Sequence, residues 1–306
     1  MSLVSIVMSP IRTYLYPICL TFGCIGNIFI LIIFNQQRTN VCSLYLRVLA
    51  VMNFLYLLYS GFTQIFPASY INVTLKDIVL CKLQYYIPSA LGQVGKSMLI
   101  YACIDRYMVT SERALVRAFS TIKQAKYLIV IAILVWLILP IHTIVFTYVD
   151  QGQCTKSATY SIFLTLYSLI VINLIPTIMF ILFTYLTLQN MKQVGRRARI
   201  NTKNFLQQRE RDLLILIISE IIFQITTTIL YPIIQFEMLI TQYIFEVKPY
   251  NYIQLETVLF QISLLLLYMN SAAPFFIYLL SAKSFRQGFI QLFITLYNRT
   301  KQSIHI

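Results

Sequence analysis

An acid and a base stand side by side at the end of a long apolar run, in the stretch MLIYACIDRYMVTSE at residues 98–112. Asp105 accepts hydrogen bonds through its carboxylate oxygens, and the guanidinium of Arg106 carries N–H donors in a planar fork. Such a pair can form a charged, hydrogen-bonded unit, and an unpaired guanidinium beside apolar helices is costly. We therefore expect Arg106 to be bonded to carboxylates, Asp105 among them.

Side chains that commonly perform catalysis are scarce. Only two histidines occur, His142 and His305, and no H-E-x-x-H pattern or comparable ligand cluster accompanies them. Covalent catalysis needs a nucleophile with a base beside it, and no such arrangement can be recognised. We expect no enzymatic activity, no metal site and no cofactor.

The composition indicates the environment in which these residues must be positioned. Hydrophobic residues make up 58% of the 306 residues, charged residues only 11%, and the mean hydropathy is +0.74. Average soluble domains carry about 25% charged residues, so this chain has too few to solvate a surface. Apolar stretches of about 17–25 residues, long enough to cross a bilayer, recur along the chain. The sequence therefore predicts a multispanning membrane protein.

Seven apolar stretches predict an all-α membrane protein with a seven-transmembrane helix bundle, because a helix satisfies its backbone polar groups within one segment. The expected spans are 14–34, 43–66, 79–107, 125–149, 161–188, 212–240 and 254–280. An extracellular segment at 1–13 precedes the bundle of residues 14–280, and a short amphipathic helix with a cytoplasmic tail follows at 281–306.

Charge placement predicts the orientation of the bundle. One set of loops contains few of the 24 Lys and Arg residues, namely Arg12, Lys76, Lys82, Lys156 and Lys248. All the others except Lys96 fall in the opposite loops and the C-terminal tail, which the positive-inside tendency assigns to the cytoplasm. We expect a plasma-membrane protein with an extracellular N-terminus and a cytoplasmic C-terminus. The net charge of +14 then reflects membrane topology and not nucleic-acid binding.

The cysteines fit this topology. Four of the six fall within expected spans or near the cytoplasmic face, and only Cys81 and Cys154 fall at or in extracellular segments. These two can form a disulfide in an oxidising compartment. The sequon at Asn72 lies in an extracellular loop, where glycosylation is expected.

The third expected span has the length to connect the two membrane surfaces. From Cys81 to Arg106 a helix rises about 37 Å, at about 1.5 Å per residue. The hydrocarbon core is about 30 Å thick. Cys81 at one surface therefore places Asp105 and Arg106 at the other, where charge is tolerated.

Short motifs occur along nearly all the expected spans. They are Gly26-Asn27 in the first span, LAVMN at 49–53 in the second, IDRY at 104–107 in the third, Trp136 in the fourth, Pro176 and Pro232 in the fifth and sixth, and NSAAPFFIYLLSAKSFRQGF at 270–289 at the end. With these motifs, and with Cys81 at the matching separation from IDRY, the chain resembles the rhodopsin-like (class A) family of G-protein-coupled receptors. The resemblance implies a receptor that converts binding of an extracellular ligand into activation of a heterotrimeric G protein.

Several positions depart from the family pattern. Asn53 replaces the acid of the second span, and Pro274 and Phe275 stand where the family has Asn-Pro, so that only Tyr278 of Asn-Pro-x-x-Tyr is kept. Leu230 replaces the tryptophan before the sixth-span proline. The chain is therefore expected to be a divergent member with an altered switch.

The resemblance implies a switch at the cytoplasmic end. Asp212 lies about 30 Å of helix before Pro232 and so reaches the same surface as Arg106. We expect Arg106 to bond Asp105 and Asp212 at rest, and outward movement of the sixth helix about the Pro232 kink to break the second bond and open a cleft for the G protein. The candidate switch and coupling residues are Asp105, Arg106, Tyr107, Asp212, Pro232 and Tyr278.

Polar residues inside the spans need internal partners. Lys96 lies about 15 Å of helix inward from Arg106, a depth from which its side chain reaches the interface only with difficulty. An ionisable group at this depth is a functional candidate. Its expected partners are Glu220, Thr226 and Asn53. Three asparagines are expected to form a hydrogen-bonded core that joins the first, second and seventh spans: Asn27, Asn53 and Asn270.

The ligand is left open between two classes. Pro88 and Tyr268 occupy positions where amine receptors carry an aspartate and light receptors carry the retinal lysine, so neither ligand is expected. The extracellular acids Asp150, Glu237, Glu246 and Glu256 suit a cationic peptide, and a small chemosensory molecule is the alternative. The expected pocket residues are Gln84, Tyr85, Gln235, Glu237 and Tyr268.

A seven-helix transporter that uses Lys96 is the alternative function from a different class. Transporters of this kind show an internal repeat and paired broken helices around charges at the membrane midplane. The sequence contains no such repeat, which favours the receptor.

Overall fold

The computed structural model describes residues 7, 9–35, 40–64, 77–150, 153–197, 204–245 and 248–304, so Asn72 lies outside the described residues. The helical elements are η1 (Ile11–Leu15), α2 (Tyr16–Asn35), α3 (Val41–Gln64), α5 (Ile78–Thr110), α6 (Ala114–Ala118), α7 (Ile122–Ile138), α8 (Ile141–Phe146), α9 (Ala158–Tyr167), η2 (Ser168–Leu174), α10 (Ile175–Arg197), α11 (Asn204–Thr228), α12 (Leu230–Ile244), α13 (Tyr250–Ala272), α14 (Pro274–Ser281) and α15 (Lys283–Ile304). Two strands, β1 (Thr147–Asp150) and β2 (Gln153–Lys156), pair antiparallel with Thr147 opposite Lys156.

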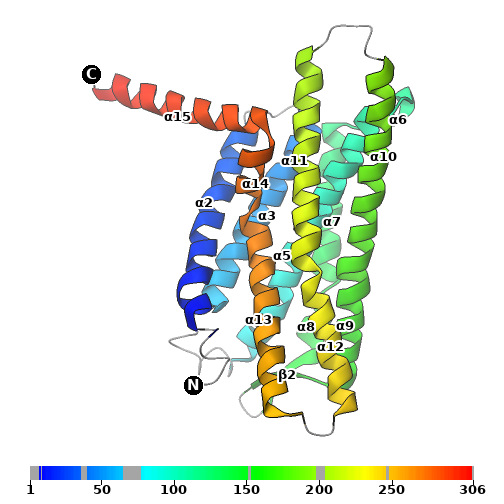
Figure 1. Ribbon diagram of the computed structural model, residues 1–306, viewed down its shortest axis with the longest axis vertical. Helices are drawn as coiled ribbons and strands as arrows, with labels where there is room; N and C mark the ends of the chain where they lie inside the picture. The colour runs from blue at the N-terminus through cyan, green and yellow to red at the C-terminus, as the bar shows by residue number, and fades with distance from the viewer. Residues whose placement is uncertain are drawn as a thin grey trace.

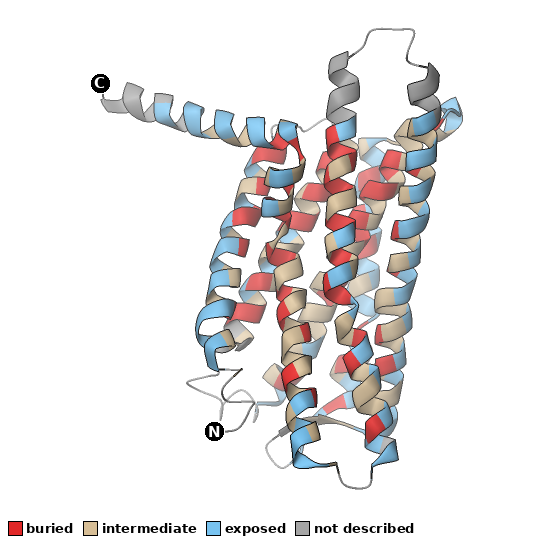
Figure 2. Ribbon diagram, in the orientation of Figure 1, coloured by how far each residue is buried: buried red, intermediate tan, exposed pale blue. Residues whose placement is uncertain are grey.

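The long helices stand side by side in one bundle, and α15 lies across one end of it (Figure 1). We call that end the Arg106 end and the opposite end, which carries the β1–β2 hairpin, the disulfide end. Buried residues line the inward faces of the helices, whereas the outward faces are mostly exposed (Figure 2). Ile131, Leu134 and Ile138 on α7 are each more than half exposed. A large apolar surface of this kind is unfavourable in water and suits a lipid environment.

Among the described residues, six helical stretches are long and apolar enough to cross a membrane: Thr13–Asn35, Val41–Gly61, Ile122–Phe146, Ala158–Lys192, Arg211–Gln242 and Tyr250–Ala272. They overlap six of the seven spans expected from the sequence. The remaining span is α5, whose polar residues, Gln84, Gln93 and Lys96 among them, lower its hydropathy. With 33 residues α5 is nevertheless long enough to cross, and it contacts α3, α7 and α10. The predicted all-α membrane fold is confirmed.

The sixth and seventh expected spans are each divided into two helices. Ile229 separates α11 from α12, three residues before Pro232. Proline has no N–H to donate to the carbonyl four residues earlier, and its ring clashes with that carbonyl, which here belongs to Thr228. Ala273 likewise separates α13 from α14, directly before Pro274. The helix is therefore interrupted beside Pro232, where a kink was expected, and a second interruption precedes Pro274.

The helix α15 packs one face against the bundle. The ring of Phe29 on α2 lies 5.2 Å from that of Phe289 and 6.1 Å from that of Phe293. Ile290 and Ile294 are more than half exposed on the remainder of the helix. An amphipathic helix that presents apolar residues beside the end of a membrane bundle is placed to lie along the membrane surface.

Candidate functional site

At the Arg106 end, Asp105 and Arg106 form the expected buried ion pair. The Nη2 atom of Arg106 lies 2.6 Å from Oδ2 of Asp105, and its Nε donates to the same oxygen at 3.2 Å. Ser120, just before α7, donates to the other carboxylate oxygen, Oδ1, at 2.5 Å. The exposed fraction is 0% for Asp105 and 3% for Arg106. The arginine is therefore folded into the bundle, and Asp105 also binds the segment between α6 and α7.

The expected bond between Arg106 and Asp212 is wrong for this conformation. Asp212 instead accepts hydrogen bonds from the backbone N–H of Ser284, at 2.8 Å, and from its hydroxyl. Ser284 is the second residue of α15. The first amides of a helix lack intrahelical partners and carry a partial positive charge, so they attract a carboxylate. Asp212 of α11 thus caps the N-terminus of α15.

Tyr278 is buried and hydrogen-bonded to α11, the first helix of the sixth span. Its hydroxyl donates to Oε2 of Glu220 on α11. Only 1% of Tyr278 is exposed, because the rings of Phe34 and Phe285 pack against it. Glu220 is also buried and forms no ion pair with any described residue. The phenol is therefore the polar partner that stabilises this carboxyl group.

The expected asparagine core is only partly correct. Asn27 of α2 donates to the carbonyl oxygen of Ser271 on α13 at 3.0 Å, so the first and seventh segments are joined. Asn270 instead faces the sixth segment: its Nδ2 donates to Oε1 of Gln224 at 2.7 Å, and Thr227 donates to its Oδ1 at 3.4 Å.

Asn53 forms no hydrogen bond with any described residue, so the second segment does not join this core as expected. Its side chain lies beside Gly95 of α5, where an added Cβ would meet the Oδ1 atom at 3.8 Å. The absence of a side chain at residue 95 thus brings Asn53 against the third segment.

Further hydrogen bonds join the sixth span (α11 and α12) to the seventh span (α13 and α14) nearer the disulfide end. At the disulfide end, Tyr252 donates to Glu237, and Thr241 donates to Glu256 at 2.8 Å. We call the set the 6–7 seam. Its pairs are Asp212–Ser284, Glu220–Tyr278, Gln224–Asn270, Thr227–Asn270, Glu237–Tyr252 and Thr241–Glu256.

Lys96 has a different partner from those expected. Its Nζ donates to the carbonyl oxygen of Ile172 at 2.9 Å and to Oδ1 of Asn173 at 3.3 Å. Both residues belong to η2, a π-helical stretch of seven residues. The carbonyl of Ile172 lacks its usual helical donor because the residue four positions later is Pro176, which has no N–H. The proline marks this carbonyl as an available acceptor, but only the structure shows that it faces Lys96, and Glu220, Thr226 and Asn53 were wrong as candidates.

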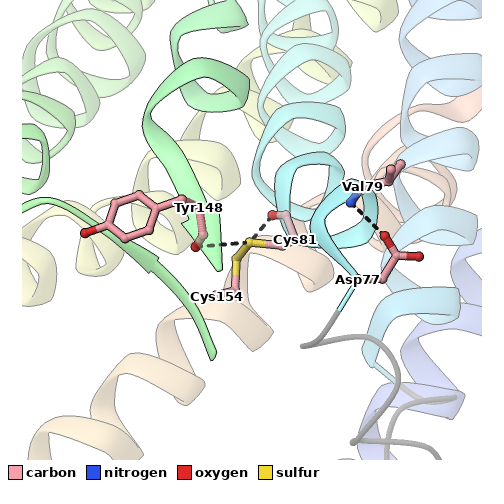
Figure 3. The surroundings of a disulfide bond; sticks show 5 residues. All are labelled: Asp77, Val79, Cys81, Tyr148 and Cys154. Atoms are coloured by element: carbon pink, nitrogen blue, oxygen red, sulfur yellow. Dashed lines mark hydrogen bonds between the residues drawn. A yellow bond between two sulfur atoms is a disulfide. The ribbon is translucent and has the colours of Figure 1, made fainter. Parts of the chain in front are cut away.

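At the disulfide end, the predicted bond between Cys81 and Cys154 is confirmed, with a Cα–Cα distance of 5.5 Å. It joins the first turn of α5 to the β1–β2 hairpin, and the sulfur atoms lie beside the backbone of Tyr148 (Figure 3). Asp77 begins α5 by accepting a hydrogen bond from the N–H of Val79 at 2.7 Å. The hairpin is therefore fixed across the start of α5.

The five expected pocket residues have different surroundings. Tyr268 packs against the rings of Tyr16 and Tyr56, at 5.3 Å and 5.9 Å. A cavity of about 10 Å³, enough for roughly one water molecule, lies beside it on the side of α2 and α3. Tyr85 contacts Lys156 of the hairpin instead. The other three lie on α5 and α12: Gln84, Gln235 and Glu237.

The acids expected to attract a cationic ligand are already engaged where the structure describes them. Lys248 lies 2.6 Å from Oε1 of Glu256, which is buried. Glu237 accepts from Tyr252. Asp150 is exposed at the end of β1, and Glu246 lies outside the described residues. Intramolecular bonds thus reduce the attraction of this rim for a cation.

The chain matches the family model described as 7 transmembrane receptor (rhodopsin family) over residues 26–278. The chain belongs to the rhodopsin family of seven-transmembrane receptors. The match extends from the Gly26-Asn27 motif to Tyr278 and so includes the disulfide, the Asp105–Arg106 pair and most of the 6–7 seam. A comparison with curated proteins found no match.

The sequence analysis did not predict the hydrogen-bond pairs of the 6–7 seam in this rhodopsin-family receptor. The clearest signal was the spacing of Asp212, Glu220, Gln224 and Thr227, which places polar side chains on one face of an otherwise apolar helix. That pattern indicates a polar helix contact, although not with which helix. Ser284 had no comparable signal, because its role depends on where α15 begins.

Tyr107 and Pro232 remain switch candidates. The ring of Tyr107 packs against Phe183 of α10 at 5.9 Å, so it faces the fifth segment and not the seam. Pro232 lies in the first turn of α12, beside the break at Ile229. Within the described residues, no group of three His, Cys, Asp or Glu side chains could hold a metal ion.

Proposed function

We propose that this receptor converts binding of an extracellular ligand at the disulfide end into activation of a heterotrimeric G protein at the Arg106 end. The N-terminus is extracellular and the C-terminus cytoplasmic in a plasma membrane. Two independent features support this orientation: the basic residues concentrate in the loops of the Arg106 end, and the disulfide belongs in an oxidising compartment. A peptide is the favoured ligand, and a small chemosensory molecule is the alternative.

The observation that carries the proposal is the bonding of α11 at the Arg106 end. Asp212 and Glu220 hold α11 against Ser284 and Tyr278. Arg106 is only 3% exposed, and α11 contacts α5, the helix that carries it. A conformation with these bonds intact offers no access to Arg106, so it corresponds to the inactive state.

Activation then requires α11 to move away from α14 and α15. Breaking the Asp212–Ser284 and Glu220–Tyr278 bonds, together with the bonds of Gln224 and Thr227 to Asn270, releases the helix. The break at Ile229 provides a point about which it can turn. The movement uncovers Arg106 and Tyr278 for the G protein. Leu115 on α6 is 81% exposed and supplies an apolar contact beside the opened cleft.

The test replaces Asp212 with alanine and measures guanine-nucleotide exchange by purified receptor in lipid nanodiscs, with one Gα subunit from each major class. Hydrogen bonds to charged groups contribute about 1.5–3 kcal/mol. Loss of the cap should therefore raise basal exchange on the order of tenfold with the cognate Gα. Ser284→Ala should give a smaller rise, because the backbone N–H of residue 284 remains available.

Ser281→Ala is the matched control, because the Ser281 hydroxyl donates only to the carbonyl of Ile277 in its own helix, at 2.6 Å. It should leave basal exchange unchanged. Unaltered exchange in Asp212→Ala, at equal amounts of folded receptor, would contradict the proposed latch. Absence of exchange with every Gα class, in the wild type and all variants, would contradict G-protein coupling itself.

A further inference from the structure

Lys156 is held over an aromatic ring at the disulfide end. It is the last residue of β2 and follows Cys154 by two positions, so the disulfide to Cys81 fixes its place. Tyr85 lies one helical turn beyond Cys81 on α5. The Nζ atom of Lys156 lies 3.6 Å from the centroid of the Tyr85 ring, a cation–π contact. The disulfide thus brings together one side chain from the hairpin and one from the third segment.

The Lys156 ammonium has no anionic partner among the described residues. Neither the Arg106–Asp105 nor the Lys248–Glu256 ion pair includes Lys156, and its Nζ atom forms no hydrogen bond with a described residue. Asp150 is exposed at the far end of the hairpin, where it pairs with Gln153. Partial burial of this cation lowers its pKa to about 8. A cation that is partly removed from water without a counter-charge is the complement of an anionic group.

One acceptor atom on α12 also lacks a partner. Tyr231 of α12 lies within electrostatic range of Tyr85 and accepts a hydrogen bond from Nε2 of Gln235 at 2.7 Å. The Oε1 atom of Gln235 is buried without a hydrogen-bond partner. A ligand that brings N–H donors together with an anionic group would satisfy both the amide oxygen and the ammonium. Peptides carry both chemical groups.

We propose that Lys156, positioned by Tyr85 and the disulfide, is the docking point for a carboxylate of the receptor's ligand. The inference rests on the proposed function, in which the disulfide end receives the ligand. It also changes the expected charge preference: the ligand presents a carboxylate to this site, although the acids of the rim by themselves predict a cationic ligand. Tyr85 is 36% exposed and Lys156 is half-buried, so neither side chain is enclosed in the core of the bundle.

The test observes Lys156 directly and requires neither the natural ligand nor a G protein. Lysines of the purified receptor are converted to ¹³C-dimethyl-lysine, which keeps the charge, and the Lys156 signal is identified by its loss in Lys156→Arg. Benzoate, benzamide and benzamidine are then titrated as planar probes that are anionic, neutral and cationic. Lys82, beside Cys81 on the same end of α5, is the internal control.

Benzoate should shift the Lys156 signal saturably, with a half-saturating concentration on the order of tenfold below that of benzamide. The Lys82 signal should change only linearly. Equal responses to benzoate and benzamide, equal responses of the two lysines, or a preference for benzamidine would each overturn the proposal. Because nucleotide exchange by the Asp212 variant is measured separately, failure here is distinguishable from failure of the receptor function.

Discussion

At the scale of single residues, the receptor handles each buried charge in a different way. Asp105 neutralises Arg106 directly, whereas Lys96 is held by two neutral oxygens of η2, the backbone carbonyl of Ile172 and the side-chain Oδ1 of Asn173. Glu220 relies on a phenol. Each of these groups is costly to bury and is therefore retained with a specific hydrogen-bond partner. Lys96 forms no contact that indicates a transport pathway, and its bonds join α5 to the fifth segment.

Lys156 makes stability depend on pH in a predictable direction. Its pKa is lowered to about 8 by burial, against about 10.4 for an unperturbed lysine. Between these values the unfolded chain binds more protons than the folded chain, so stability rises as the pH increases from about 8 to about 10. The titratable group in contact with it is Tyr85, and Asp150 of the same hairpin forms no ion pair.

Lys156→Gln should therefore be more stable than the wild type at pH 7, and the difference should shrink as the pH approaches 10. Thermal unfolding of the two proteins in detergent from pH 7 to 10 measures this. Lys82→Gln, at the same end of α5, is the control for loss of a lysine outside the Lys156–Tyr85 contact. A wild-type midpoint that falls further below the variant as the pH rises would be the wrong sign.

At the scale of elements, the sixth span consists of two helices, α11 and α12, separated at Ile229. Both form hydrogen bonds on the face that meets the seventh span. The bonds of the 6–7 seam occur on both sides of the break at Ile229, and Asp212 binds α15 as well. Movement of α11 must therefore disrupt every seam bond before the break, while α12 can keep its contacts with α13. The residues of α11 that form these bonds are Asp212, Glu220, Gln224 and Thr227. The position of the break determines which of the bonds are released.

Pro232→Ala tests the role of this break. Alanine restores an N–H for the Thr228 carbonyl and favours a continuous helix. We expect higher thermal stability and a several-fold reduction of the raised basal exchange in the Asp212→Ala background. Pro17→Ala, near the start of α2 and remote from the seam, should not lower that exchange. Basal exchange that is unaffected by Pro232→Ala would show that the movement does not use this hinge.

At the scale of the whole molecule, two functional ends are separated by the length of the bundle. The disulfide, the hairpin and Lys156 lie at one end, and Arg106, α6 and α15 lie at the other (Figure 1). The apolar outer surface between them fits the lipid core. In the proposed function, a signal between the ends passes through the helices, and the 6–7 seam has contacts on both sides of the break at Ile229 through which the two ends can be coupled.

The orientation is tested by labelling with a membrane-impermeant thiol reagent on intact cells. Tyr250→Cys, at a position 69% exposed at the start of α13, should react. Leu115→Cys on α6 should react only after the cells are permeabilised. Labelling of both positions from the same side, or the reverse pattern, would contradict the proposed topology and the receptor function with it.

The sequence alone determined the features that depend on chain-local properties. Hydropathy located the spans, Pro232 located the break in the sixth span, and topology selected Cys81 and Cys154 as partners. The Asp105–Arg106 pair was predictable because the two residues are adjacent. Only the tertiary structure decided that Asp212 binds Ser284 and that Lys96 binds a carbonyl of η2. Such partners depend on how each helix is rotated and where it begins, and one residue of register turns a side chain by about 100°.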